Sequence, residues 1–247
     1  MLLAILTDLH ANREALSACL AHARERGAQR YAFLGDLVGY GADPAWVVDT
    51  VMDHVGQGAI AVQGNHDLAV AQAPSKHMHQ EARKVIEWTR ARLDASQLQF
   101  LERLPLTQEM GDILFVHASA AEPQHWEYIS GTLEAIKSMQ ATRCRVTFCG
   151  HVHEPALYNL SMTGKISSFV PTGDSSIPLG TTRRWLVIPG AVGQPRDGNP
   201  AACYALYDDT THDLTYFRVP YDHESAAAKI REAGLPPSLA NRLEHGR

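Results

Sequence analysis

The sequence predicts an α/β fold in which two packed, mixed sheets are flanked by helices. Two observations support this class. Up to Gly150, short apolar runs typical of buried parallel strands alternate with segments whose apolar residues recur at helical spacing. After Gly150, strand-like runs follow one another with turn residues and no helix between them. The 247 residues suffice for a substantial core, and we expect one domain over residues 1–247.

The first half of the chain contains five predicted strands and the helices that connect them. The strands are expected at residues 2–7, 31–35, 59–63, 113–117 and 145–150, and the helices at 12–26, 44–54, 132–141 and, as a pair, within 76–103. Asp43 before Pro44 has the pattern of a helix N-cap, and Asp94 or Ser96 is expected to cap the second helix of the pair. The alternation predicts a mostly parallel sheet.

The second half predicts a separate antiparallel sheet. Its strands are expected at residues 156–160, 165–170, 184–189, 202–208 and 214–220, with turn sequences between them. A last helix is expected near 222–233, followed by a polar tail after Pro236 and Pro237.

Composition and charge restrict the class of function. The formal net charge of −5 gives no electrostatic footprint for nucleic acid or for an anionic membrane. No run approaches the roughly 18 apolar residues of a membrane span, and the N-terminal MLLAILT is expected to be a strand rather than a signal peptide. The four cysteines are scattered and are expected to be reduced core residues, which favours a cytoplasmic location.

Metal-capable side chains follow every predicted strand of the first half. A single histidine after a strand is more often a hydrogen-bonded loop residue than a ligand, but strand ends of an α/β sheet converge where ligands bind. The residues are Asp8, His10, Asp36, Asn65, His66, His117, His151 and His153. Mixed imidazole and carboxylate ligands suit Mn, Fe, Zn, Co or Ni, and this set is large enough for two ions. Two such ions with a bridging water are suited to hydrolysis of phosphate esters.

The blocks DLH (8–10), GDLVGYG (35–41), GNHD (64–67), the strand-ending His117 and GHVH (150–153) resemble, in order, the motifs of the calcineurin-like metallophosphoesterase superfamily. The resemblance implies a four-layer α/β/β/α sandwich with a dimetal site. By matching position, Asp8, His10 and His153 would bind one ion, and Asn65, His117 and His151 the other. Asp36 would bridge the two ions, and a hydroxide bridging them would attack phosphorus.

The GNHD block divides its roles under the same resemblance. His66 would not bind metal but would face the substrate and protonate the leaving oxygen as a general acid. Asp67 could orient His66 or cap the following helix.

The second block indicates a branch of the superfamily. Protein serine/threonine phosphatases carry Asp and Arg where this chain has Gly39 and Tyr40. The sequence is more similar to the small bacterial and archaeal phosphodiesterase-like group, which implies a small-molecule phosphodiester substrate, with phosphomonoesters as an alternative.

Phosphate-binding candidates lie outside the ligand blocks. Arg13, Arg183, Arg184 and Arg196 are candidates, although Arg196 could instead pair with Asp197 or another acid in a rigid turn. Asn12 could cap a helix or point into the site. Trp126, in the loop after His117, could wall the pocket or simply pack. The KHMH run (76–79) has ligand-like spacing but lies outside the strand-end pattern, and a solvated helix face is expected there.

Two alternatives use the same fold differently. One is a non-catalytic scaffold that binds a partner protein, against which the complete ligand set argues. The other is a nuclease, which would need a basic groove that the composition does not show. The sequence does not specify the oligomeric state.

Overall fold

The computed structural model of the chain describes residues 1–72 and 80–247. Its strands form two six-stranded sheets within these ranges. In spatial order, the first sheet contains β3 (Ile60–Ala61), β2 (Arg30–Phe33), β1 (Leu2–Leu6), β11 (Ala202–Asp208), β12 (Asp213–Val219) and β9 (Ser176–Pro178). The second contains β4 (Thr107–Met110), β5 (Ile113–Val116), β6 (Val146–Phe148), β10 (Arg183–Ile188), β7 (Ala156–Ser161) and β8 (Ile166–Phe169).

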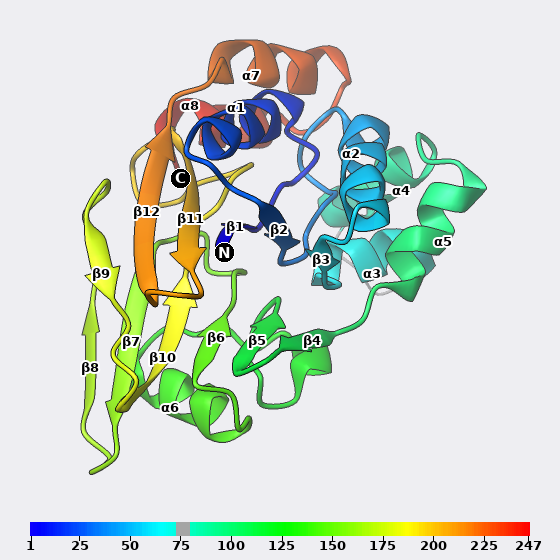
Figure 1. Cartoon of the computed structure of the whole chain (residues 1–247). Coiled ribbons are helices and arrows are strands. Elements are labelled where there is room, and N and C mark those ends of the chain that lie inside the picture. Colours follow the sequence, from blue (N-terminus) through cyan, green and yellow to red (C-terminus); the bar gives the residue numbers. More distant parts are fainter. Residues whose placement is uncertain (73–79) are drawn as a thin grey trace.

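Helices cover the outer faces of the two sheets (Figure 1). The described helices are α1 (Arg13–Glu25), α2 (Pro44–Gly56), α3 (Asn65–Gln72), α4 (Gln80–Arg90), α5 (Ala95–Arg103), α6 (Thr132–Gln140), α7 (His223–Glu232) and α8 (Pro237–His245). Helix α6 packs on the second sheet through Ala135 and Met139, while α1 and α2 pack on the first. None of these helices has the length and apolar character to cross a bilayer.

The apolar side chains form layers that follow from strand geometry. Successive residues of a strand point to opposite faces. In β1, Leu3 and Ile5 therefore pack between the sheets against residues such as Phe115 and Phe148, whereas Leu6 packs toward the helices. This arrangement of helix, sheet, sheet and helix confirms the predicted four-layer sandwich.

The predicted division of the strands between the sheets is wrong. Parallel strands β1 to β3 lie in the first sheet, but β5 and β6 lie in the second, where β10 pairs with β6 in parallel. Strands β11 and β12 return to the first sheet through antiparallel pairing of β11 with β1. Each sheet therefore takes strands from both halves of the chain, because local sequence pattern does not specify the partner strand.

Several elements differ from the prediction. The expected polar tail forms helix α8, and α3, β4 and β9 were not predicted. Asp43 occupies the N-cap position of α2, but its side chain does not cap the helix and instead accepts a hydrogen bond from Lys229. Asp94 caps α5 as predicted. The expectations for residues 76–79 fall outside the described residues. All four cysteines are buried and free.

Candidate metal centre

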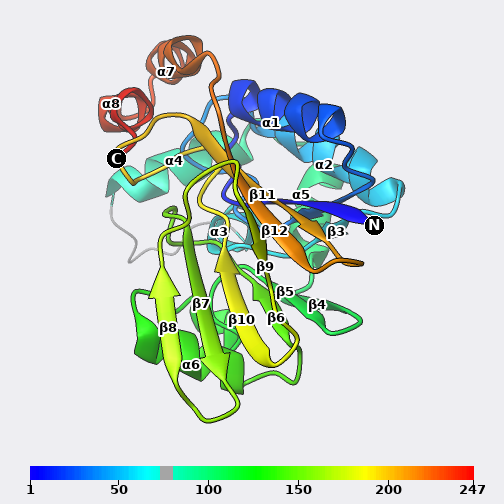
Figure 2. The same ribbon diagram turned by 60° about the vertical axis from the view of Figure 1, so that its left-hand side comes forward.

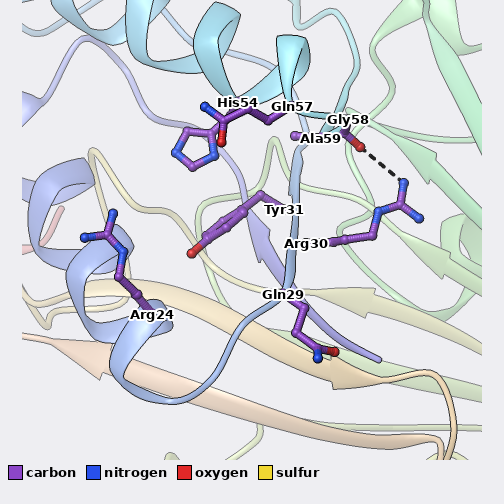
Figure 3. A pocket seen from close by; sticks show the side chains of 8 residues that line it. All are labelled: Arg24, Gln29, Arg30, Tyr31, His54, Gln57, Gly58 and Ala59. Atoms are coloured by element: carbon purple, nitrogen blue, oxygen red, sulfur yellow. Dashed lines mark hydrogen bonds between the residues drawn. The ribbon is translucent and has the colours of Figure 1, made fainter.

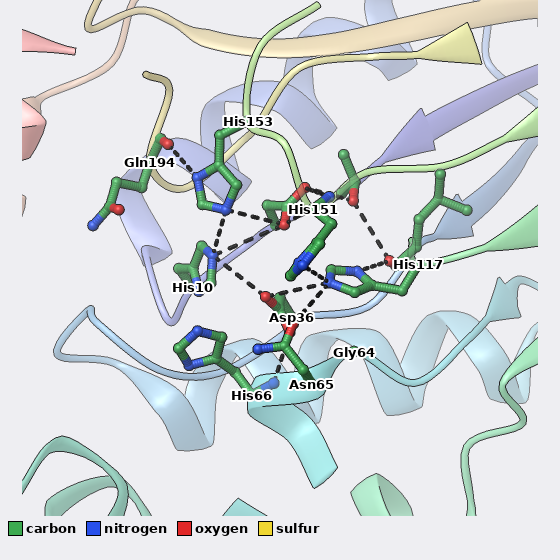
Figure 4. A network of polar contacts seen from close by, with 12 residues as sticks. His10, Asp36, Gly64, Asn65, His66, His117, His151, His153 and Gln194 are labelled. Carbon is green, nitrogen blue, oxygen red and sulfur yellow. Dashed lines mark hydrogen bonds and ion pairs between the residues drawn. The ribbon is translucent and has the colours of Figure 1, made fainter. Parts of the chain in front are cut away.

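The predicted ligands converge where the carboxyl ends of strands from both sheets meet. Asp8 and His10 follow β1 and Asp36 follows β2, all in the first sheet. In the second sheet, His117 follows β5, and His151 and His153 follow β6. Figure 4 shows the side chains of His10, Asp36, His117, His151 and His153 turned toward one another, with Asn65 among them and His66 at the rim. All but the half-buried Asn65 and His66 are buried.

The backbone of these residues is unusual. Five of the predicted ligands have a positive φ, between 47° and 68°: Asp8, His10, Asp36, His151 and His153. This left-handed region is uncommon for residues other than glycine and is concentrated at functional sites. The sharp turns bend the chain back within one or two residues of a strand end, so alternate residues can face the same centre.

The first ligand group contains Asp8, His10, Asp36 and His153, whose candidate ligand atoms lie within 4.8 Å of one another. The Nε2 atom of His153 is 3.2 Å from Oδ1 of Asp8 and 3.1 Å from Nε2 of His10. The carboxylate of Asp36 approaches Nε2 of His10 at 3.7 Å.

Asp36 also belongs to the second group, with His117 and His151. Its Oδ2 atom is 3.4 Å from Nε2 of His117, the same nitrogen that lies 3.1 Å from Nδ1 of His151. The amide oxygen of Asn65 is 3.2 Å from that nitrogen. Asp36 is therefore shared between the two groups, as a bridging ligand would be.

The hydrogen bonds behind the imidazoles show that these residues fit a metal ion. His10, His117 and His153 each have Nδ1 within hydrogen-bond distance of a backbone carbonyl, of Val38, Leu34 and Gln194 respectively. A neutral imidazole that donates from Nδ1 has a lone pair on Nε2, so the facing Nε2 atoms of His10 and His153 would repel each other. A cation between them removes this repulsion, and such backbone partners are typical behind metal-bound histidines.

The buried charges also call for a cation. Although burial opposes its protonation, the carboxylates of Asp36 and Asp8 raise the pKa of His117 to about 9. Burial lowers the pKa of His151 to about 4, with further lowering by His117. Burial also raises the pKa of Asp8, but His153 beside it holds that pKa well below its ordinary value. The cluster therefore holds two ionised carboxylates, whose charge either a proton on His117 or a bound cation can balance.

Helix α3 separates the roles of Asn65 and His66. The helix begins at Asn65, so the two adjacent side chains leave it in directions about 100° apart. The backbone N–H of His66 donates to Oδ1 of Asp36 at 2.9 Å. A Cβ at Gly64 would collide with the backbone nitrogen and carboxylate of Asp36, so glycine permits this close approach.

Asp67 contacts the start of α3, as one alternative expected, and also the loop after β2. One carboxylate oxygen accepts from the backbone N–H groups of Leu37 and Val38, at 2.8 and 3.2 Å. The other accepts from the N–H of Gly64 at 2.9 Å, at the start of α3. Asp67 thus ties the GDLVG loop to the GNHD turn instead of contacting the His66 ring. Burial, followed by the charge of Asp36, raises its pKa to about 7.

The structure separates the predicted phosphate-binding residues. Arg13 is exposed, with its guanidinium 5.1 Å from the centre of the Trp46 ring, so its proposed role at the site is not supported. Arg183 donates to the side chain of Asn159, and Arg184 donates to the backbone carbonyls of Thr142 and Cys144.

Arg196 remains beside the site. Its Nη2 donates to Gln194 at 3.1 Å, and Asp197 pairs with Arg218 rather than with it. Its guanidinium lies 5.9 Å from the centre of the Tyr40 ring.

Aromatic side chains wall the second ligand group. The half-buried ring of Trp126 lies 5.8 Å from that of His117, and Tyr128 stacks on His151 at 3.9 Å. Tyr128 is 53% exposed, so this wall is open to solvent. Asn12 caps α1 by accepting from Ala15, which confirms one of its two alternatives.

Sequence reasoning missed Tyr40 and Arg242 as residues of the site. The Tyr40 ring packs against His10 and His66, each at 4.5 Å between ring centres, and the guanidinium of Arg242 lies 5.9 Å from it. The position of Tyr40 directly after Gly39 in the second ligand block could have indicated that it lies near the site. Arg242 gave no such indication, because it lies far along the chain in the unpredicted helix α8.

These features define an α/β sandwich with a buried Asp/His group able to bind metal where its two sheets meet. Residues 1–212 match the model of the calcineurin-like phosphoesterase superfamily domain. The chain therefore belongs to this superfamily, as its motifs predicted, and the buried group fits a metal-dependent phosphoesterase.

Similar proteins occur in bacteria and archaea. An uncharacterized protein of Methanocaldococcus jannaschii is 32% identical, covering 100% of this chain and 98% of the relative. A metallophosphoesterase from Sphaerobacter thermophilus is 36% identical with a TM-score of 0.89, covering 100% of this chain and 99% of that chain. A hypothetical protein from Pyrococcus horikoshii shares the fold, with 20% identity, a TM-score of 0.78, and coverage of 100% and 98% respectively.

Proposed function

We propose that the chain is a dimetal phosphoesterase that hydrolyses phosphodiesters, with phosphomonoesters as second substrates. The observation that carries this proposal is Asp36, whose carboxylate is shared by two groups of ligands in which imidazole nitrogens face each other at 3.1 Å. Asp8, His10 and His153 would hold one ion, and Asn65, His117 and His151 the other. When bound, two divalent ions neutralise phosphate oxygens and lower the pKa of a shared water.

The residues around the cluster have separate tasks in this proposal. The backbone N–H of His66 donates to Asp36, and the imidazole of His66 protonates the leaving oxygen. Arg196, whose guanidinium lies 5.9 Å from the centre of the Tyr40 ring, supplies positive charge for the phosphate. Trp126 and Tyr128 bound the site beside His117 and His151. The absence of the phosphatase-type Asp and Arg at Gly39 and Tyr40 favours diesters over the substrates of protein phosphatases.

The test measures hydrolysis of bis-p-nitrophenyl phosphate and p-nitrophenyl phosphate with Mn. We expect His66→Ala to lower kcat for methyl phenyl phosphate, whose phenol leaves poorly without a proton, by about 10²–10⁴-fold, and to affect the p-nitrophenyl esters less, while the protein keeps its metal. His10→Ala is the matched comparison and should lose metal as well as activity, both read by elemental analysis of the purified proteins. If the wild type hydrolyses neither p-nitrophenyl ester with Mn, Fe, Zn, Co or Ni, the proposed function is refuted. Loss of metal in His66→Ala would refute the role of His66.

A further inference from the structure

A cavity of about 260 Å³ opens beside His66. Tyr40 and His66 form one side of it, and residues of α4 and α8 form the other. The opposite side is partly apolar and partly polar, and includes Ala82, Val85, Ile86, Ser238, Leu239 and Arg242. His66 therefore lies between the ligand cluster and this cavity.

Helix α8 is held against α4 by specific contacts. Leu239 of α8 and Val85 of α4 belong to one buried cluster, against which Tyr40 packs. The indole N–H of Trp88 in α4 donates to the carbonyl of Ala233, between α7 and α8, at 3.1 Å. Figure 2 shows α8 above α4 at the same side of the molecule. Since the family match covers residues 1–212, helix α8 lies beyond the matched part of the domain, whereas α4 lies within it.

Positive charge collects at the same place. The guanidinium groups of Arg196 and Arg242 each lie 5.9 Å from the centre of the Tyr40 ring. In the part of the chain that the structure describes, neither forms an ion pair with a carboxylate, and Nε of Arg196 is buried without a hydrogen-bond partner. Glu81 also lines the cavity, but it is exposed and forms no ion pair with Arg242 among the described residues.

A second cavity gives a useful contrast. It has a volume of about 180 Å³ and is lined by Arg24, Arg30, Tyr31 and His54 among others (Figure 3). It lies at the start of β2, whereas Asp36 follows the end of that strand, and no candidate ligand lines it. Arg30 is also already bound to the carbonyl of Gly58. Of these two cavities, the one beside His66 is lined by a residue of the proposed chemistry.

We propose that the cavity between Tyr40, His66, α4 and α8 binds the leaving alcohol of the phosphoester, and that Arg242 selects alcohols bearing an anionic substituent. This inference rests on the proposed function. In that reaction a water molecule loses a proton to solvent and its oxygen bonds to phosphorus, while the bond from phosphorus to the alcohol oxygen breaks. The proton of His66 passes to the alcohol oxygen, and His66 then regains a proton from solvent. The alcohol must therefore lie within reach of His66, and the cavity is the space that His66 lines on the side of α4 and α8.

The test uses two diesters of nearly equal size, methyl 4-carboxyphenyl phosphate and methyl 4-carbamoylphenyl phosphate, which differ in the charge of the leaving group. We expect Arg242→Gln to lower kcat/KM for the carboxylate ester about tenfold and to leave the amide ester within about twofold, as for loss of a charge-assisted contact. Arg103→Gln is the matched control, because Arg103 lies in the last turn of α5 as the half-buried Arg242 lies in the last turn of α8, but Arg103 is exposed and does not line the cavity. Arg103→Gln should leave kcat/KM unchanged for both esters.

A second pair of variants tests the space itself. Ala82 lines the cavity on α4, so Ala82→Trp should lower kcat/KM for both esters about tenfold through exclusion of the aryl group. Ala91→Trp makes the same substitution at an exposed position just beyond α4, outside the cavity, and should have no such effect. Circular dichroism verifies that each variant is folded.

The outcomes separate the two proposals. If the wild type hydrolyses both esters and neither Arg242→Gln nor Ala82→Trp changes the rates relative to its control, the subsite is refuted while the proposed function stands. If nothing is hydrolysed, the proposed function fails, and calorimetric titration of the carboxylate ester into the Mn-supplemented wild type and Arg242→Gln decides the subsite. Weaker binding to the variant supports it, and equal or absent binding refutes it.

Discussion

At the residue scale, the ring of His66 is positioned by packing rather than by a carboxylate. Its neighbours are the rings of Tyr40 and His10, with centres 4.5 and 5.1 Å away, and the backbone at Gly39. A Cβ at Gly39 would lie 2.7 Å from Nδ1 of His66. The absence of a side chain at residue 39 therefore gives the His66 ring its place.

This contact predicts the effect of Gly39→Ala. The added methyl group should displace the His66 ring, and a displacement near 1 Å can lower kcat about 100-fold, with the bound metal retained. Gly58→Ala is the matched control, because Gly39 and Gly58 have φ of 89° and 93°, but no atom lies within 4 Å of a Cβ at Gly58. Both variants carry the same backbone strain. A difference between them in activity, metal content or urea unfolding therefore reports the contact between the added methyl group and the His66 ring. Equal activity in the two variants would contradict this explanation.

The residues of the site were predictable to different degrees. The ligand positions follow from local pattern, since each comes directly after a recognisable strand and strand ends converge. The partner of Asp67 was not predictable, because the N–H groups of Leu37 and Val38 approach it only after folding. The arginines were not predictable either, since the residues next to Arg13 in the sequence do not indicate that it packs on Trp46.

At the scale of elements, Asn12 links three parts of the chain near the site. Its side-chain oxygen accepts from the N–H of Ala15 in the first turn of α1. Its side-chain nitrogen donates to the carbonyl of Gly193, after β10, at 2.9 Å and to the hydroxyl of Tyr221, before α7, at 3.1 Å. A buried side chain that caps one helix thus also holds the loop that carries Gln194 behind His153.

Two substitutions separate these roles of Asn12. Asn12→Ala removes the cap and both donated bonds, and should lower the free energy of unfolding by about 2–3 kcal/mol. Asn12→Ser keeps a good capping oxygen but cannot donate to both acceptors, so we expect a loss of about 1–2 kcal/mol. Urea denaturation at equal m-value provides the comparison. If the serine variant is as unstable as the alanine variant, the cap contributes nothing measurable here.

At the scale of the whole molecule, the two sheets share one site. The alternation of elements predicted the sandwich and its helices. The route of the chain between the sheets depends instead on pairings such as β1 with β11, whose paired residues lie 200 or more positions apart. Asp36 follows a strand of the first sheet and His117 follows a strand of the second, and Oδ2 of Asp36 is 3.4 Å from Nε2 of His117. Ions bound here would connect the sheets as well as serve the reaction.

This arrangement predicts that metal stabilises the fold. An ion that binds only the native state adds about 2.7 kcal/mol at 100 times its Kd, which for a chain of this size raises Tm by roughly 5–10 °C. Asp36→Asn keeps an oxygen that can accept from the backbone N–H of His66 but removes the shared negative charge. Most of the rise in Tm on addition of Mn should therefore disappear in this variant. Asp53→Asn, at an exposed position of α2, is the control and should retain the full rise in Tm with Mn. Calorimetric scans with Mn and with chelator measure both, and a full shift in Asp36→Asn would show that Asp36 does not join the two ligand groups.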